Sequence, residues 1–463
     1  MYKVIFRFVL IAVLCVSVLA GCSQPSNTDA PASGTNTPVT TTPDGDTPSG
    51  PETIVVGGWP AADTAFEAII PMFNEIYPDI TVEMGTFMPS GDYHRELQAV
   101  LVAGSGAPDV TLVEEAHVMN FKDQGFLVNL LDAPYDAGRY QNDFVDVKWN
   151  SAVSTDGTSL SGLIWDIGPA CYFYNKEVFA EVGLPTEPAE VEAYMSTWEG
   201  VLDVAEKVSI PGQRWFIPNA GDVFQWPSIG RDYYDKDLNL KFEKRPGFEG
   251  AMDAAMAIRQ NGWDAQVELW ADETYGYMNN GQLASVATGC WYGGFMKSWI
   301  APDLAGKWGI CRLPGGLPDM NFGGSYLCIP EQSQHKDAAW KFIEFALATK
   351  EAQNAMFEAV DYFPAYKPAW DDPMYEMEDP YFDNQKTRAL WVDIASKMEA
   401  PEMPTPMDSD VEWILVHTFS DSMDGGLSKE EIIQAIKDQI ADTTKPDRDR
   451  FIETLTNAGR WEQ

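Results

Sequence analysis

Positive charge is scarce in this sequence. Its 463 residues include 31 lysines and arginines against 70 aspartates and glutamates, a formal net charge of −39 at pH 7. A nucleic-acid binder needs a basic face to neutralise phosphates, and docking on anionic lipid headgroups needs a basic cluster. The composition therefore argues against both, and we interpret the acidity as a solvated, soluble surface.

Common catalytic motifs are also missing. There is no Gly-x-Ser-x-Gly elbow, no His-Glu-x-x-His and no Gly-x-x-x-x-Gly-Lys-Ser/Thr phosphate loop, which also excludes a transporter ATPase. The histidines are few and scattered, so we expect hydrogen-bonded or exposed side chains rather than metal ligands; they are His94, His117, His335 and His417. We therefore expect no catalytic residue, no metal and no cofactor. A glycoside hydrolase stays open, because its two carboxylates, about 5 to 10 Å apart, leave no spacing signal.

Cysteine is rare, and no Cys-x-x-Cys pattern supports zinc or thioredoxin chemistry. Four cysteines fall in the body of the chain: Cys171, Cys290, Cys311 and Cys328. Buried free thiols and disulfides, with three possible pairings, both remain open.

The first 51 residues are predicted to lie outside the fold. Lys3 and Arg7 precede a largely apolar run that is typical of a secretory signal and too short to span a bilayer. The run ends Leu-Ala-Gly-Cys, which resembles a bacterial lipoprotein signal, so we expect residues 1–21 to be removed and Cys22 to carry lipid. A plain signal peptide that happens to end in Cys is the alternative.

Residues 22–51 are predicted to be the lipidated cysteine and a disordered tether. From Ser23 to Pro51, 20 of 29 residues are Ser, Thr, Pro or Gly and none is Lys or Arg. No apolar periodicity is available to bury, which is typical of a flexible linker.

Residues 52–463 have the pattern of an α/β protein. Apolar strands and amphipathic helices alternate, as in a right-handed crossover onto a parallel sheet. The opening strands are predicted over 53–60, 80–84 and 108–113, with helices over 63–77 and 93–102. Later helices are predicted over 175–182, 189–208, 251–260, 337–348 and 429–440.

Several segments resemble one family, the extracellular solute-binding proteins of bacterial sugar ABC importers, the maltose-binding-like group. The segments run in family order over nearly all of residues 52–463. They are 103–110 (AGSGAPDV), 126–132 (FLVNLLD), 172–185 (YFYNK…F…GLP), 278–291 (MNNGQLA…GCW), 308–330, 336–343 and 363–367.

The resemblance implies a two-lobed periplasmic-binding-protein-like α/β fold, in which each lobe is a doubly wound sheet and crossing strands form a hinge. The expected N-terminal lobe is 52–113 plus 323–365, and the expected C-terminal lobe is 114–322 plus 366–463. The chain crosses between lobes near Val113, Phe322 and Phe363. Ligand is expected in the cleft between the lobes, with hinge closure on binding.

Sugar recognition sets two requirements for candidate residues. The apolar face of a sugar ring stacks on an aromatic ring, and its hydroxyls need fixed donors and acceptors. The candidates at strand ends and crossovers are Trp59, Glu114, Asp166, Trp291, Gly324, Ser325 and Trp413. Weaker candidates, for which a core position is the stronger alternative, are Glu115, Trp165, Tyr172, Trp226, Trp270 and Tyr292.

The sequence therefore predicts a monomeric, non-enzymatic binding component of a carbohydrate ABC importer. Its expected partners are a di- or oligosaccharide, the permease subunits and, through a lipid anchor, the membrane. Its expected location is the outer face of the cytoplasmic membrane or the periplasm. No nucleic acid is expected. A secreted carbohydrate-active enzyme, or a surface adhesin or sensor with the same fold, is the alternative.

Overall fold

The computed structural model describes residues 50–461. The predicted signal, Cys22 and nearly all of the tether lie outside the described residues. Within them, no helix has both the length and the apolar character that crossing a membrane requires.

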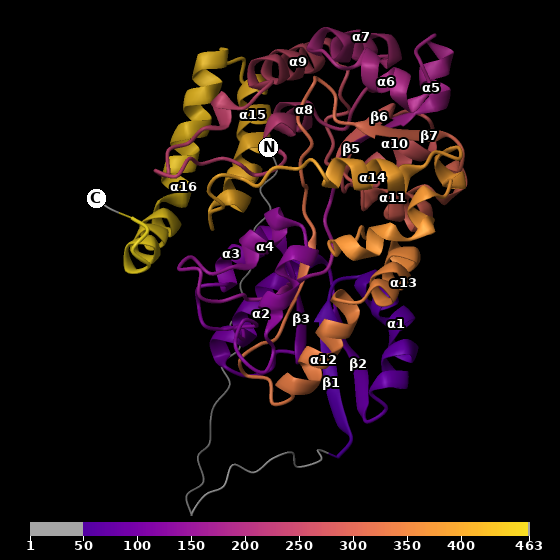
Figure 1. Ribbon diagram of the computed structural model, residues 1–463. Coiled ribbons are helices and arrows are strands. Elements are labelled where there is room, and N and C mark those ends of the chain that lie inside the picture. The colour runs from indigo at the N-terminus through magenta and orange to yellow at the C-terminus, as the bar shows by residue number, and fades with distance from the viewer. Residues whose placement is uncertain (1–49, 462–463) are drawn as a thin grey trace, which may run out of the picture. The chain divides into compact units, whose positions relative to one another are not determined.

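One sheet has five strands in the order β2-β1-β3-β8-β4. β1 pairs in parallel with β2 and β3, as the strand–helix–strand pattern predicts, whereas β8 pairs antiparallel with β3 and β4. Helices α1, α12 and α13 lie beside β1 and β2 (Figure 1). The elements are β1 (Glu52–Gly58), α1 (Ala62–Ile76), β2 (Ile80–Phe87), α2 (Ser90–Ala103), β3 (Val110–Glu114), α3 (Glu115–Phe121), α4 (Asp146–Ala152), β4 (Leu163–Ile164), β8 (Ser325–Cys328), α12 (Lys336–Leu347) and α13 (Lys350–Val360).

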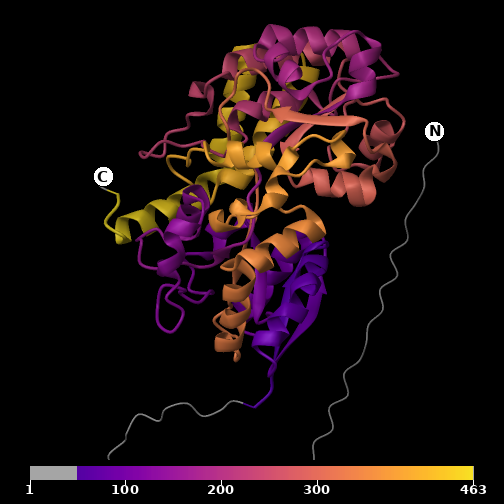
Figure 2. The same ribbon diagram turned by 45° about the vertical axis from the view of Figure 1, so that its right-hand side comes forward.

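A second, smaller sheet has the order β6-β5-β7, and both of its pairings are antiparallel. Outside the named strands, isolated parallel β-bridges join Trp215 to Leu283 and Ile217 to Asp264. Figure 2 shows this sheet and its helices from another side. The elements are β5 (Ala170–Asn175), α5 (Lys176–Glu181), α6 (Pro188–Tyr194), α7 (Trp198–Val208), α8 (Ala220–Gln225), α9 (Phe248–Asn261), α10 (Asp272–Asn279), β6 (Ser285–Gly289), α11 (Tyr292–Phe295), β7 (Trp308–Arg312), α14 (Thr387–Ala395), α15 (Asp408–Asp424) and α16 (Lys429–Asn457).

The buried side chains form two clusters: one contains the first sheet and one face of the second sheet, and the other packs against the opposite face of the second sheet. Phe66 and Phe342 pack in the first, and Tyr172 and Trp226 pack in the second. Met119 of α3 packs against both clusters. Two sheets flanked by helices confirm the predicted α/β class. The prediction that each lobe holds a doubly wound sheet is wrong for the second sheet, whose pairings are antiparallel.

Two predicted helices have different bounds in the structure. The helix predicted over 189–208 is two helices, α6 and α7, because the Thr197 side chain accepts a hydrogen bond from Gly200 N and starts a new helix there. The helix predicted over 429–440 continues through Pro446 to Asn457 as α16. α15 packs along α16, which favours the longer helix over the break that a proline alone indicates.

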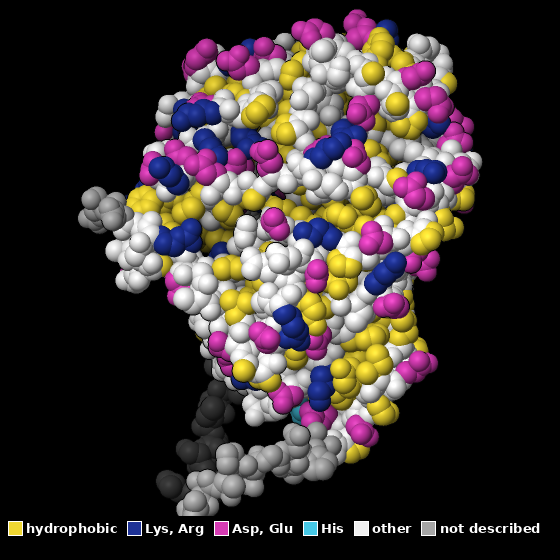
Figure 3. All heavy atoms as spheres, in the orientation of Figure 1, with side chains coloured by type: hydrophobic (Ala, Val, Ile, Leu, Met, Phe, Trp, Pro, Cys, Tyr) yellow, Lys and Arg dark blue, Asp and Glu magenta, His cyan; other side chains and the backbone are white. Residues whose placement is uncertain are grey.

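The acidic side chains are spread over the visible face rather than gathered in one patch (Figure 3). Hydrophobic side chains form a band across the middle of the same face. The wide distribution of acids agrees with an acidic, solvated surface.

Candidate functional site

The crossing strands, here the connections that pass between the two sheets from β4 to β5 and from β7 to β8, bring four predicted residues together at the end of β3. Glu114, the last residue of β3, lies opposite Ser325 of β8. Gly324 has a φ of +96°, and a Cβ there would lie 2.3 Å from the carbonyl oxygen of Asp166. Only glycine fits this approach, so the crossing fixes Glu114, Asp166, Gly324 and Ser325 beside one another.

Glu114 is held by polar neighbours from α2. The Ser90 hydroxyl donates to Glu114 Oε2 at 2.6 Å. Burial alone would raise the pKa of the Glu114 carboxyl, but His94, the Ser90 hydroxyl and the Arg231 guanidinium outweigh burial and lower that pKa. Glu114 is therefore a fixed carboxylate that can accept hydrogen bonds at neutral pH.

His94 and His117 stack beside Glu114, with ring centroids 4.1 Å apart. The backbone N–H of Glu114 donates to His94 Nε2 at 3.0 Å, and His94 Nδ1 lies 2.7 Å from the carbonyl oxygen of Ser90. These contacts fix the neutral tautomer with its proton on Nδ1. Burial, and then His117, lower the pKa of His94 to about 4.

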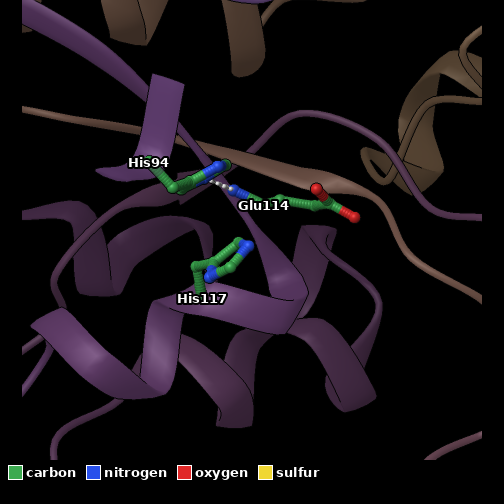
Figure 4. A group of neighbouring side chains, drawn as sticks. All are labelled: His94, Glu114 and His117. Atoms are coloured by element: carbon green, nitrogen blue, oxygen red, sulfur yellow. Dashed lines mark hydrogen bonds between the residues drawn. The ribbon is translucent and has the colours of Figure 1, made fainter. Parts of the chain in front are cut away.

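The ligand atoms of His94, Glu114 and His117 lie within 4.8 Å of one another, close enough for a metal ion to be considered. The backbone occupies both ring nitrogens of His94, which leaves no lone pair for a metal. Figure 4 shows the Glu114 side chain extending away from the two rings. The contacts of His94 fit the expected hydrogen-bonded histidine, while the fold brings His94 and His117, which are 23 residues apart in the sequence, into contact.

Lys148 is fully buried behind the crossing strands. Its Nζ donates to the carbonyl oxygen of Gly323 at 3.1 Å and lies 3.4 Å from Glu115 Oε2. Asn321 Nδ2 donates to the same Glu115 oxygen at 2.7 Å. Burial lowers the pKa of Lys148, whereas Glu115 and then Asp166 raise it. Glu115 therefore neutralises Lys148 and is committed to this contact.

Asp166 is 3% exposed, and its Oδ1 has no hydrogen-bond partner among the described residues. Burial raises the pKa of Asp166 to about 6, although Lys148 and the Ser325 hydroxyl lower it. The backbone of Asp166 bridges to Pro364, at the third predicted crossing. Asp166 thus lies at the crossing strands but beneath the surface.

Arg231 comes from the irregular segment after α8 and was not among the predicted residues. Its Nε donates to Glu412 Oε2 at 2.6 Å, and its guanidinium lies 5.9 Å from the ring centroid of Phe322. Its Nη1 is buried without a partner in the described part of the chain. The residue has a φ of +54°, an uncommon conformation for a side chain of this size. Such strain is often found at functional sites.

An aromatic cluster adjoins Phe322. Trp291 Nε1 donates to the Phe322 carbonyl oxygen at 2.9 Å, and the two rings lie 6.1 Å apart. Trp270 stacks on Trp291, with centroids 5.8 Å apart and planes 9° apart. Trp270 is 51% exposed and Trp291 is half-buried, so Trp270 presents the outer ring.

The remaining tryptophans divide between the site and the cores. Trp59, directly after β1, is half-buried and lies 5.4 Å from the His94 ring. Trp413 on α15 is 58% exposed and stacks on His417, outside the crossing strands. Four weaker candidates are fully buried core residues: Trp165, Tyr172, Trp226 and Tyr292.

A small cavity adjoins these groups. It is lined by Glu115, Arg231 and Asn321 together with side chains from 399–408, and it holds about 30 Å³. A water needs about 10–15 Å³ of such space. A sugar ring therefore reaches this side of Arg231 only if the surrounding segments move apart.

Comparison with known proteins shows similarity over most of the chain. The family model described as bacterial extracellular solute-binding protein matches residues 68–382. An arabinooligosaccharide-binding protein of Halalkalibacterium halodurans is 28% identical over 330 residues, which cover 68% of this chain and 72% of that protein. Another, from Bacillus subtilis, is 27% identical over 328 residues, 67% and 72% of the two chains.

The fold also matches solved structures. The binding protein associated with an ABC transporter of B. animalis subsp. lactis Bl-04, in complex with β-1,6-galactobiose, superposes with a TM-score of 0.70 at 22% identity. The match covers 86% of this chain and 98% of that one. This similarity confirms the predicted two-lobed fold.

Proposed function

The chain belongs to the bacterial extracellular solute-binding proteins, and on that premise we propose that it is the substrate-binding component of a carbohydrate ABC importer. It captures a sugar, a di- or oligosaccharide, between its lobes and delivers it to the permease subunits. The lobes predicted from the sequence are 52–113 with 323–365 and 114–322 with 366–463. The first boundary is wrong, because β4 (Leu163–Ile164) pairs with β8 in the first sheet, and α3 and α4 pack beside β3 and β4. The chain therefore leaves the first sheet after Ile164 rather than near Val113.

One observation carries this proposal: an exposed aromatic surface adjoins a cluster of fixed polar groups. Trp270 and Trp291 offer the flat apolar surface on which a sugar ring stacks. Phe322 connects them to Arg231, whose charge acts on Glu114. The cluster supplies donors and an acceptor for hydroxyl groups. The names of the two curated relatives support an oligosaccharide as ligand.

Binding without turnover is the activity that we infer. The matching family and the curated relatives are binding proteins. Glycoside hydrolysis needs one carboxyl to give a proton and another to attack or activate water. Here Glu115 is committed to Lys148 and Asn321, and Asp166 lies beneath the surface. Because neither carboxyl is available for these roles, a binding site is favoured over the enzymatic alternative. Delivery of the sugar to a permease would distinguish this protein from an adhesin or sensor.

Membership of this family implies that the protein is located outside the cytoplasm. We propose that the monomer is held at the membrane by lipid on Cys22, with residues 22–51 as tether. Mass spectrometry of the membrane-bound protein tests this: a lipid-modified N-terminal cysteine supports the anchor, and an unmodified one excludes it.

Calorimetry with a sugar panel tests the function. We expect saturable, one-to-one binding of an arabinooligosaccharide or of β-1,6-galactobiose, with no new sugar products in the mixture by chromatography. Product formation would favour a hydrolase. Failure of every sugar to bind, while a peptide or polyamine binds, would refute the carbohydrate proposal.

Two tryptophan variants localise the binding. Trp270→Ala is expected to weaken sugar binding about fivefold or more, because one aromatic platform contributes roughly 1 kcal/mol or more. Trp299→Ala is the matched control, since Trp299 is 52% exposed but packs against Tyr275 and Phe295 and does not stack on Trp291. Equal effects of the two substitutions would remove the Trp270 surface from the site.

A further inference from the structure

Both cations near the crossing strands are already neutralised. Lys148 is fully buried and lies against Glu115 and the Gly323 carbonyl oxygen. Arg231 forms an ion pair with Glu412, and both side chains are less than one-fifth exposed. Neither cation is therefore left for a charged ligand.

Glu412 is itself held rigidly in its pair with Arg231. Its Oε1 accepts from Gln225 Nε2 at 3.0 Å and its Oε2 accepts from Arg231 Nε at 2.6 Å. With both carboxylate oxygens bonded inside one lobe, Glu412 cannot turn away to free the guanidinium. The pair is a fixed part of the site.

Arg231 still has a donor to offer. Its Nη1 is buried and lacks a partner within the described residues, and the side chain lines the small cavity beside Asn321. A buried, unpaired donor carries a free-energy penalty that an incoming acceptor removes. Because Glu412 cancels its charge, this donor suits a neutral oxygen better than an anion.

The acidic residues near Arg231 also disfavour a negatively charged ligand. Glu114 lies close enough for the Arg231 charge to lower its pKa, so at neutral pH it is an anion near Arg231. Glu115 also lines the cavity with Arg231. Because Lys148 balances the charge of Glu115, Glu114 is the anion that a ligand carboxylate would meet here, whereas a ligand hydroxyl can accept from Arg231 and donate to Glu114.

We propose that Arg231, whose charge is balanced by Glu412, is a specificity-determining residue that binds sugar hydroxyls and restricts this site to uncharged carbohydrates. This inference rests on the proposed function and narrows it. Sugars that carry a carboxylate, such as uronides, are excluded by charge rather than by shape.

A matched pair of ligands tests the proposal. The probes are the neutral disaccharide that binds in the panel and the same disaccharide oxidised to a carboxylate at its primary hydroxyl. In wild-type protein the acidic form is expected to bind at least about tenfold more weakly, since mismatched charge at an interface disfavours binding strongly. Equal affinity for the two forms would overturn the inference and leave sugar capture intact.

Glu412→Gln tests the residue assignment, because Gln keeps an acceptor for Arg231 and removes the opposing charge. In this variant, the ratio of the affinity for the neutral disaccharide to the affinity for its acidic form is expected to fall about tenfold from the wild-type ratio. Glu344→Gln is the matched control. Glu344 lies on α12 and also pairs with an arginine, Arg139, but not with Arg231. The affinity ratio of this control should stay at the wild-type value. An unchanged ratio in Glu412→Gln, with a native melting curve, would refute the role of this pair. If no neutral sugar binds at all, the proposed function fails, and this inference fails with it.

Discussion

At the residue scale, Asp166 shows how burial at the crossing strands affects a carboxyl group. Its ordinary pKa is 3.8, and burial raises the pKa to about 6 in the folded protein against the opposing effect of Lys148. The folded protein therefore holds this proton at pH values where the unfolded chain has lost it. The Asp166 contribution to stability consequently falls as pH rises from about 4 to about 6.

Asp166→Asn removes this pH dependence, because asparagine resembles the protonated acid and cannot ionise. The variant is expected to be more stable than wild type at pH 7.5, by up to about 3 kcal/mol, and to show no such gain near pH 4. Thermal melts at the two pH values measure the difference.

Asp156→Asn is the control with the opposite sign. The Ser154 and Thr158 hydroxyls lower the pKa of Asp156 to about 2, so its charged form stabilises the fold at neutral pH. Loss of stability in Asp166→Asn at pH 7.5, to the same extent as at pH 4, would contradict the assigned role of burial.

At the element scale, the register between β3 and β8 depends on the close approach at Gly324. Gly324→Ala is expected to cost more than about 3 kcal/mol, because a Cβ would overlap the Asp166 carbonyl and the backbone is left-handed. Gly306→Ala is the matched control, since Gly306 has a φ of +80° but open space around it; its cost should be about 1–2 kcal/mol. Denaturant unfolding measures both, and equal costs would show that contact with Asp166 is unimportant.

Elements with a local signal were predictable from the sequence. α1 and β2 follow from apolar spacing and from the proline that precedes β2. The break between α6 and α7 was missed because it depends on one side-chain cap, at Thr197. The length of α16 was missed because its packing on α15 outweighs Pro446.

The candidate site was predictable where it lies at strand ends. Glu114 and Gly324 were predicted to lie at a strand end and a crossover, and the structure places both there; their contact with ligand stays a prediction. Arg231 was missed because its segment has no periodicity, and its partner Glu412 lies 181 residues away in sequence. His94 and His117 come from two helices whose meeting no local pattern reveals.

At the scale of the whole molecule, the dominant quantity is the excess of negative charge. A formal charge of −39 spread over the surface produces self-repulsion in the compact state. We expect the melting temperature to rise as NaCl increases from about 10 mM to about 0.3 M, where the Debye length falls well below about 10 Å. Choline chloride should give the same rise, which separates screening from specific sodium binding. A melting temperature that falls with both salts would mean that screened ion pairs outweigh the repulsion.

The four cysteines of the described body are free and buried, which resolves the choice that the sequence left open. Burial raises the pKa of each of these thiols, so none is a thiolate at neutral pH. Reaching the native state therefore requires no oxidant, and a reducing environment leaves the folded body unchanged. Because these thiols are buried, a thiol-reactive dye can label them only when the cores around them open. The rate of labelling therefore reports the rate of unfolding.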